Sequence, residues 1–299
     1  MSASSGPIVV IGAKGAVGRE ICLQAQAAGL PVVGWGRDEL SATVDLEALL
    51  ALLDAAKPRA VVNCLSMTGL DKCFREAPQA FEANGFFPLK LAAAAKIRDL
   101  PVLQFSTENV FPCNTNGLMY DEAAKTEPNT VYGLTKLLGE AADLRPFAPF
   151  HVIRLPMLFG PTNDRQIVAK LVNNLLQGNE VTVSTDVFTT PLYTPDAAGF
   201  VVEWLKGERT LAPVTHLTTE HRIALFDLIQ VIAEAVEAKG KIQATVSAKF
   251  PSLEIKPLHA GLRSNVTAPF SFEGAIKRYA DWVKRNEKVV RDEPQRSIA

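Results

Sequence analysis

The segment Pro7-Ile-Val-Val-Ile-Gly12-Ala-Lys-Gly15-Ala-Val-Gly18 decides the fold of this 299-residue chain. Its β-branched residues are typical of a buried strand, and the glycines that follow form a GxxGxxG loop that opens a helix over about residues 16–28. Glycines let a backbone approach a pyrophosphate closely, and a helix N-terminus offers free N–H groups to an anion. The loop therefore predicts a dinucleotide site, with a purely structural turn as the alternative. It is not a P-loop, because no Gly-Lys-Ser/Thr sequence closes it.

The rest of the chain alternates short apolar segments with segments of helical periodicity, which indicates βαβ units. Because the strands are apolar on both faces, we expect an α/β fold with a Rossmann-like doubly wound parallel sheet in residues 1–158. We expect a smaller, interleaved C-terminal α/β substrate-binding part in residues 159–299, with some segments of about 187–218 returning to the large sheet. Expected strands cover 31–35, 60–64, 101–106, 150–155, 181–184 and 214–217; expected helices cover 46–56, 72–81, 86–98, 130–143, 166–177, 195–206, 225–238 and 271–285.

Charge and composition exclude several classes of protein. The 31 Lys and Arg residues are balanced by 32 Asp and Glu residues, so the basic excess of a nucleic-acid-binding protein is missing. The cysteines Cys22, Cys64, Cys73 and Cys113 form no CxxC pair, which indicates reduced thiols and no metal site. We expect neither a signal peptide nor a membrane span, and hence a cytoplasmic protein. The sequence is compatible with a homodimer.

Two further motifs carry chemistry. Tyr132-Gly-Leu-Thr-Lys136 places a phenol and an ammonium on one face of a predicted helix. The ammonium would lower the tyrosine pKa from its ordinary value of about 10. The strand that ends in Ser106-Thr107 puts a hydroxyl where ligands meet an α/β sheet, and this hydroxyl would hold a substrate carbonyl. Alone, the first motif is typical of a surface helix and the second of a capping turn.

The glycine loop followed by Tyr-x-x-x-Lys resembles the extended short-chain dehydrogenases/reductases. Over nearly its full length the chain is similar to their dTDP-4-dehydrorhamnose reductase branch. The matching motifs are Asp45-Leu46, Val62-Asn63-Cys64, Ala83-Asn84-Gly85, Ser106-Thr107-Glu108-Asn109-Val110-Phe111, Tyr132-Gly-Leu-Thr-Lys136 and Gly139-Glu140. The resemblance implies a reductase of a ketone on a sugar, a nucleotide-linked sugar or a similar polar carbonyl compound. It implies that Tyr132 gives the proton, Lys136 tunes Tyr132 and orients the ribose, and Thr107 holds the carbonyl oxygen.

The expected cofactor is NADP(H), with NAD(H) as the alternative. An NAD site usually carries an acid at the end of its second strand, whereas this strand is followed by Gly36-Arg37, and a guanidinium binds a 2′-phosphate well. Asp38 is the counterargument, since it lies close to the position of a ribose-binding acid. The residues expected at the cofactor are Gly12, Lys14, Gly15, Ala16, Val17, Gly18, Arg37, Asp45, Leu46, Cys64, Leu65, Ser66, Asn84, Tyr132, Lys136 and Leu155.

The residues expected at the substrate are Met67, Thr107, Glu108, Asn109 and Met157. Met157 stands where the family has a tryptophan against the sugar, and Glu108-Asn109 replaces an Asp-Tyr pair. These departures argue against dTDP-4-dehydrorhamnose itself as the substrate. Two other functions stay open: a non-catalytic NADP-binding regulatory subunit resembling the methionine adenosyltransferase β subunit, and an epimerase or dehydratase of the same superfamily.

Overall fold

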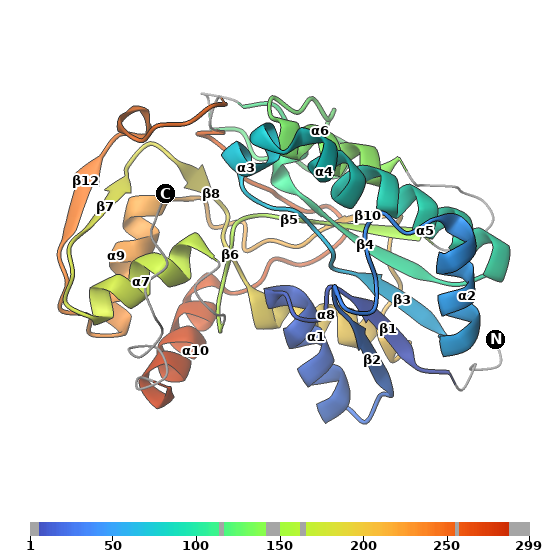
Figure 1. Ribbon diagram of the computed structural model, residues 1–299. Helices are drawn as coiled ribbons and strands as arrows, with labels where there is room; N and C mark the ends of the chain where they lie inside the picture. The colour runs from blue at the N-terminus through green and yellow to red at the C-terminus, as the bar shows by residue number, and fades with distance from the viewer. Residues whose placement is uncertain (1–5, 114–116, 142–149, 162–165, 255–256, 287–299) are drawn as a thin grey trace.

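A computed structural model describes residues 6–113, 117–141, 150–161, 166–254 and 257–286. Its centre is a six-stranded parallel sheet in the order β10-β5-β4-β3-β1-β2 (Figure 1). The strands are β1 (Ile8–Ile11), β2 (Val32–Trp35), β3 (Ala60–Asn63), β4 (Val102–Thr107), β5 (Phe150–Leu155) and β10 (Val214–His216). The strand order reverses direction between β1 and β3, so the predicted doubly wound sheet is confirmed.

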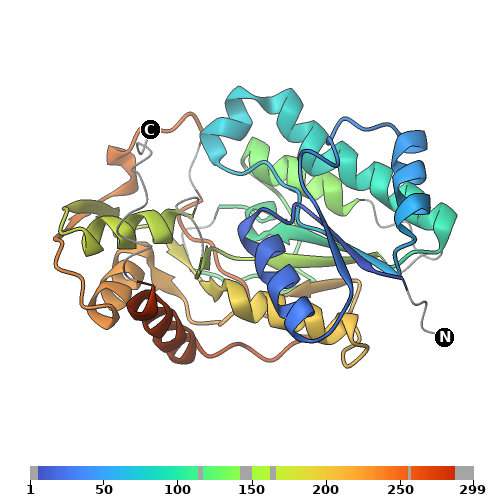
Figure 2. The same ribbon diagram turned by 60° about the horizontal axis from the view of Figure 1, so that its bottom comes forward.

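Helices cover both faces of this sheet (Figures 1 and 2). One face carries α1 (Ala16–Ala27) and α8 (Thr194–Leu205), and the other carries α2 (Leu46–Ala56), α5 (Phe87–Arg98) and α6 (Val131–Glu140). Successive side chains of a strand point to opposite faces. Ile8 and Val10 accordingly belong to the apolar core under α1 and α8, whereas Val9 and Ile11 belong to the core under α2 and α5.

The C-terminal part has a core of its own, between α7 (Ile167–Leu176), α9 (Leu225–Ala235) and α10 (Phe272–Arg285). Short strand pairs complete it: β7 (Val181–Ser184) with β12 (Ile242–Thr245), β6 (Leu158–Phe159) with β9 (Leu192–Tyr193), and β8 (Phe188–Thr189) with β11 (Ile223–Ala224). Of the segment 187–218, β10 joins the large sheet and α8 packs against α1. The strands β8 and β9 pair instead within the smaller sheets.

The helical structure expected over 72–81 is present, but it is broken at Glu76 into two short helices, α3 (Leu70–Arg75) and α4 (Ala77–Phe81). Pro78 has no N–H to donate to the carbonyl four residues earlier, which favours a break at this point. A π-helical turn, η1 (Glu82–Phe86), then runs directly into α5. The expected helix over 130–143 corresponds to α6, and residues 142–143 lie outside the described residues.

No helix within the described ranges is long and apolar enough to cross a membrane.

Gly18 tests the packing of α1 on the turn after β1. A Cβ atom at Gly18 would lie 2.4 Å from the Gly12 carbonyl oxygen, so we expect Gly18→Ala to lower the free energy of unfolding by about 1–3 kcal/mol. Gly199→Ala in α8 is the matched control, because its Cβ would meet only the end of the Gln24 side chain. Since alanine favours a helix over glycine, the control should be neutral or stabilising by up to about 1 kcal/mol. Urea denaturation measures both; equal effects at the two sites would contradict the packing described.

Candidate active site

The turn after β1 forms a close contact with the next strand in the sheet. Gly12 has φ +77°, and a Cβ atom there would lie 2.8 Å from the backbone of Cys64 and Leu65. Gly15 is the N-cap residue of α1. No side chain caps this helix end, and its first turn contains no acidic residue. The first N–H groups, including those of Ala16 and Val17, have no partner within the helix. They fit the diphosphate of a dinucleotide.

A buried asparagine fixes the loop after β3. The Asn84 side chain, in the π-helical turn, donates to the Met67 carbonyl oxygen at 2.9 Å and accepts from the Met67 N–H at 2.8 Å. The Ser66 hydroxyl donates to Asn84 Oδ1 at 3.1 Å. Asn84 also donates to the Thr135 hydroxyl of α6 at 3.1 Å. The Ser66–Met67 loop and α6 are therefore held by one amide side chain.

Three hydroxyl groups meet at the carboxyl end of the sheet. Thr107 is buried at the end of β4, and its oxygen accepts from Asn109 Nδ2 at 3.0 Å. Tyr132 lies in the first turn of α6, and the side chains of Thr107 and Ser66 lie close enough to its hydroxyl to favour the phenolate. Leu155 pairs in register with Thr107 on the neighbouring strand β5.

Lys136 lies one turn beyond Tyr132, and its ammonium donates to the Phe105 carbonyl oxygen at 2.6 Å. Burial lowers the pKa of Lys136 to about 8, although the nearby Glu140 carboxylate opposes this shift. Burial raises the pKa of Tyr132 to about 12. The expected lowering of the tyrosine pKa is therefore wrong for the protein alone, because the loss of hydration outweighs the opposing effect of the Thr107 and Ser66 side chains.

An ion pair attaches α6 to the sheet. Arg154 of β5 donates from Nε and Nη2 to the two oxygens of Glu140, at 2.9 and 2.6 Å, and both side chains are buried. The Ser106 hydroxyl donates to the same carboxylate. Glu140 is therefore fully engaged with β4 and β5, which fixes the helix that carries Tyr132 and Lys136.

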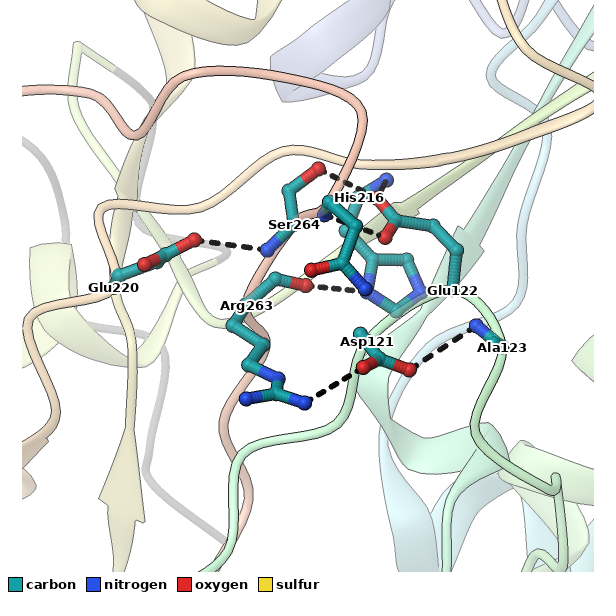
Figure 3. A network of polar contacts seen from close by, with 8 residues as sticks. Asp121, Glu122, Ala123, His216, Glu220, Arg263 and Ser264 are labelled. Atoms are coloured by element: carbon teal, nitrogen blue, oxygen red, sulfur yellow. Dashed lines mark hydrogen bonds and ion pairs between the residues drawn. The ribbon is translucent and has the colours of Figure 1, made fainter.

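This ion pair continues into the polar network of Figure 3. Arg154 donates to His216 Nε2 at 3.3 Å. In Figure 3, His216 Nδ1 donates to the Arg263 carbonyl oxygen at 3.0 Å. The Glu122 carboxylate accepts from the His216 N–H at 2.9 Å and from the Ser264 hydroxyl. Although burial opposes it, these hydrogen bonds hold the pKa of Glu122 below its ordinary value. Through His216, the network attaches β10 to Arg154 of β5 and to Glu122.

Glu108 joins the end of β4 to the C-terminal part. Its buried carboxyl group accepts from the Met157 N–H at 3.1 Å and from the Thr189 hydroxyl at 3.2 Å. Burial raises the pKa of Glu108 to about 8, and these two hydrogen bonds act against the rise. The Met157 side chain packs against the core of the C-terminal part. Glu108, directly after Thr107, thus connects the end of β4 to Met157 and Thr189 of the C-terminal part.

The residues expected at the adenosine end lie apart from this group. Lys14 forms an exposed ion pair with Asp38 at 2.6 Å. The carboxylate of Glu39 accepts from the Gly36 N–H at 2.6 Å, and Arg37 is exposed. Asp45 caps α2 by accepting from the Ala48 N–H at 2.8 Å, and Leu46, the first residue of α2, packs against the core under this helix.

Within the described part of the chain, no group of three or more His, Cys, Asp or Glu residues is arranged to hold a metal ion.

Sequence reasoning missed one residue that contacts α6. The Glu254 carboxylate accepts from the Val131 N–H at 2.6 Å, beside Tyr132. The two residues are 123 positions apart, and no local pattern connects them. The pairing of Arg154 with Glu140 was likewise not predicted, although Glu140 itself lies in a matched motif.

Comparison with known proteins gives consistent similarities. A family model described as RmlD substrate binding domain matches residues 6–286. The dTDP-4-dehydrorhamnose reductase of Streptomyces griseus is 34% identical over 191 residues, which are 64% of this chain and 62% of that protein. The dTDP-4-dehydrorhamnose reductase of Mycolicibacterium smegmatis is 27% identical over 277 residues, which are 92% of this chain and 82% of that protein.

Solved structures show the same fold. A dTDP-4-dehydrorhamnose reductase from Clostridium acetobutylicum superposes with a TM-score of 0.83 at 25% identity, covering 93% of this chain and 99% of that chain. A dTDP-4-dehydrorhamnose reductase from Bacillus anthracis in complex with NADP also has a TM-score of 0.83, at 18% identity, covering 92% of this chain and 98% of that chain.

Glu108→Gln tests the burial of the Glu108 carboxyl group. Its pKa of about 8 lies above the ordinary value of 4.5, so between these pH values the folded protein keeps a proton that the unfolded chain has released. Wild type should therefore lose stability as the pH rises through this window, whereas glutamine does not titrate. We expect the Tm of wild type relative to Glu108→Gln to fall by roughly 5 °C from pH 5 to pH 8. Thermal denaturation at constant ionic strength measures it, and a constant difference would contradict the shift.

Proposed function

The chain belongs to the RmlD substrate binding domain family of the extended short-chain dehydrogenases/reductases, and on that premise we propose that it is an NADP(H)-dependent reductase of a ketone on a nucleotide-linked sugar. The observation that carries the proposal is that the buried Thr107 side chain at the end of β4 lies next to the Tyr132 phenol, with Lys136 one turn further along the same helix. In this proposal residues 1–158 hold the cofactor. Residues 159–299 supply most of the substrate site, with Glu108 joining the two parts.

The proposed roles follow from the positions and the pKa values. A phenol with a pKa of about 12 is protonated at neutral pH, so Tyr132 has a proton to give. The Thr107 hydroxyl orients the carbonyl oxygen toward Tyr132. When bound, NADPH supplies the hydride that reaches the carbonyl carbon. As this carbon is reduced, Tyr132 protonates the oxygen to form the alcohol, and the Lys136 ammonium stabilises the phenolate that remains.

The cofactor preference rests on the charges that follow β2. Of the two carboxylates there, Asp38 is paired with the Lys14 ammonium and Glu39 accepts from the Gly36 N–H. The exposed Arg37 guanidinium lies between Gly36 and Asp38 in the sequence. A 2′-phosphate bound here would be close to two cations, the Lys14 ammonium and the Arg37 guanidinium, which favours NADP(H) over NAD(H).

Tyr132→Phe tests the chemistry, because it removes the proton donor and leaves the ring. With dTDP-4-keto-6-deoxy-D-glucose and dTDP-4-dehydrorhamnose as trial substrates, the rate of NADPH oxidation should fall at least about a hundredfold, with the NADPH Kd unchanged. Tyr279→Phe makes the same chemical change in the C-terminal core and should leave the rate near that of wild type. Near-normal turnover by Tyr132→Phe would contradict the assignment of Tyr132. A native protein that oxidises NADPH with none of the sugar ketones tested would contradict the proposed function.

Arg37→Ala tests the cofactor preference. Removal of one charge-assisted contact to the 2′-phosphate should raise the NADPH Kd roughly tenfold. The NADH Kd is the internal control and should stay constant, because NADH lacks this phosphate. Fluorescence titration of both cofactors measures the four constants. Tighter binding of NADH than of NADPH by the native protein, or an unchanged ratio in Arg37→Ala, would overturn the preference.

A further inference from the structure

A segment of the C-terminal part crosses to the catalytic helix. Residues 250–254, which we call the strap, run from the end of the β12 region toward α3 and α6 (Figure 1). The Ser252 hydroxyl and the Leu253 N–H both donate to Asp71 Oδ1 of α3, at 3.0 and 2.9 Å. These contacts place the next residue, Glu254, against the first turn of α6.

The two oxygens of Glu254 have different surroundings. Oε1 accepts from the Val131 N–H at 2.6 Å, whereas Oε2 is buried and has no hydrogen-bond partner among the described residues. A buried carboxylate oxygen without a donor costs free energy, since it has given up its hydration. Oε2 is therefore open to a donor from outside the described residues, such as a bound ligand.

The surroundings of Glu254 belong to the proposed substrate side of the site. Val131 directly precedes Tyr132. Burial raises the pKa of the Cys73 thiol to about 11, and the nearby Glu254 carboxylate adds to the rise. The same thiol donates to the Met67 carbonyl oxygen at 3.5 Å. Glu254 thus contacts the start of α6 and lies near Cys73, which itself contacts the Ser66–Met67 loop.

A second buried acceptor, in the turn after β4, also lacks a hydrogen-bond donor among the described residues. Asn109 Oδ1 is buried without a partner among the described residues, while Nδ2 of the same side chain donates to the Thr107 hydroxyl. Two buried acceptors without donors among the described residues, one next to Thr107 and one at the first turn of α6, fit a ligand that is rich in hydroxyl groups. A sugar has this chemistry.

We propose that Glu254 is a substrate-binding residue whose Oε2 accepts a hydrogen bond from a sugar hydroxyl, while Oε1 holds the first turn of α6. The inference rests on the proposed function and extends it, because it assigns a residue of the strap to the sugar. The charged acceptor makes this hydrogen bond stronger than one between neutral groups. Binding energy from Glu254 is then available for the sugar and not for the nucleotide.

Glu254→Gln tests the proposal with two ligands. Glutamine keeps an oxygen for the Val131 N–H and replaces the other oxygen by a donor. Calorimetric titration should show a Kd for dTDP-4-keto-6-deoxy-D-glucose that is roughly tenfold or more above wild type. The Kd for dTDP, which lacks the sugar, should stay unchanged. Glu254→Asp is the second variant, which keeps the charge and shortens the side chain by one methylene. It should also weaken binding of the sugar nucleotide and leave binding of dTDP unchanged.

Thr130→Ala is the matched control for a purely structural role. It removes the other capping hydrogen bond of α6, from the Gly133 N–H to the Thr130 hydroxyl at 3.0 Å. It should lower the Tm and leave both Kd values as in wild type. Unchanged sugar-nucleotide binding in Glu254→Gln, equal weakening of dTDP, or the same loss in Thr130→Ala would overturn the proposal.

The two proposals fail in different ways. A native protein that binds the sugar nucleotide through Glu254 but does not oxidise NADPH with it would contradict the proposed reduction and support the role of Glu254. A native protein that reduces the ketone, with an unaltered Kd in both Glu254 variants, would support the reduction and contradict that role. A native protein that binds no sugar nucleotide would contradict both.

Discussion

The structure depends on a strand that is buried on both faces and leaves the sheet at a point where no side chain fits. The side chains of β1 have at most 1% of their surface exposed. At Gly12 the chain turns against the backbone of Cys64 and Leu65, and Gly18 returns to within contact of the Gly12 carbonyl. This packing sets the N-terminus of α1 at the boundary between β1 and β3, where the strand order reverses. A ligand of such a sheet binds at this boundary.

The same kind of close packing places α6, the helix that carries Tyr132 and Lys136. A Cβ atom at Gly133 would lie 2.1 Å from the Asn109 carbonyl oxygen, and one at Gly139 would lie 2.3 Å from that of Asn84. Because α6 lies this close to the turn after β4 and to the π-helical turn, Tyr132 and Lys136 lose hydration. Burial raises the pKa of the phenol and lowers that of the ammonium. Opposite shifts in two neighbouring groups are typical of a site that transfers protons.

The sequence was sufficient for the features that depend on local pattern. The alternation of strands and helices predicted the doubly wound sheet, and the glycine loop and Tyr-x-x-x-Lys predicted the family. Features that depend on distant contacts were not predictable: Glu108 contacts Met157 49 residues away, and Glu254 contacts Val131 across 123 residues. The π-helical turn that orients Asn84 also has no periodic signal of its own. Arg37 and Asp45 stay predictions, because their roles depend on the bound cofactor.

The central claim is that this site transfers a hydride to a sugar ketone, and isotope transfer tests it most directly. NADPH deuterated on either face of nicotinamide C4 is incubated with the native protein and dTDP-4-keto-6-deoxy-D-glucose, and the product is analysed by NMR and mass spectrometry. The account predicts deuterium at the former carbonyl carbon from one of the two labelled cofactors, in proportion to the NADPH oxidised. Binding of both ligands without transfer of deuterium from either cofactor would contradict it, and would instead indicate a protein that binds NADP without using it.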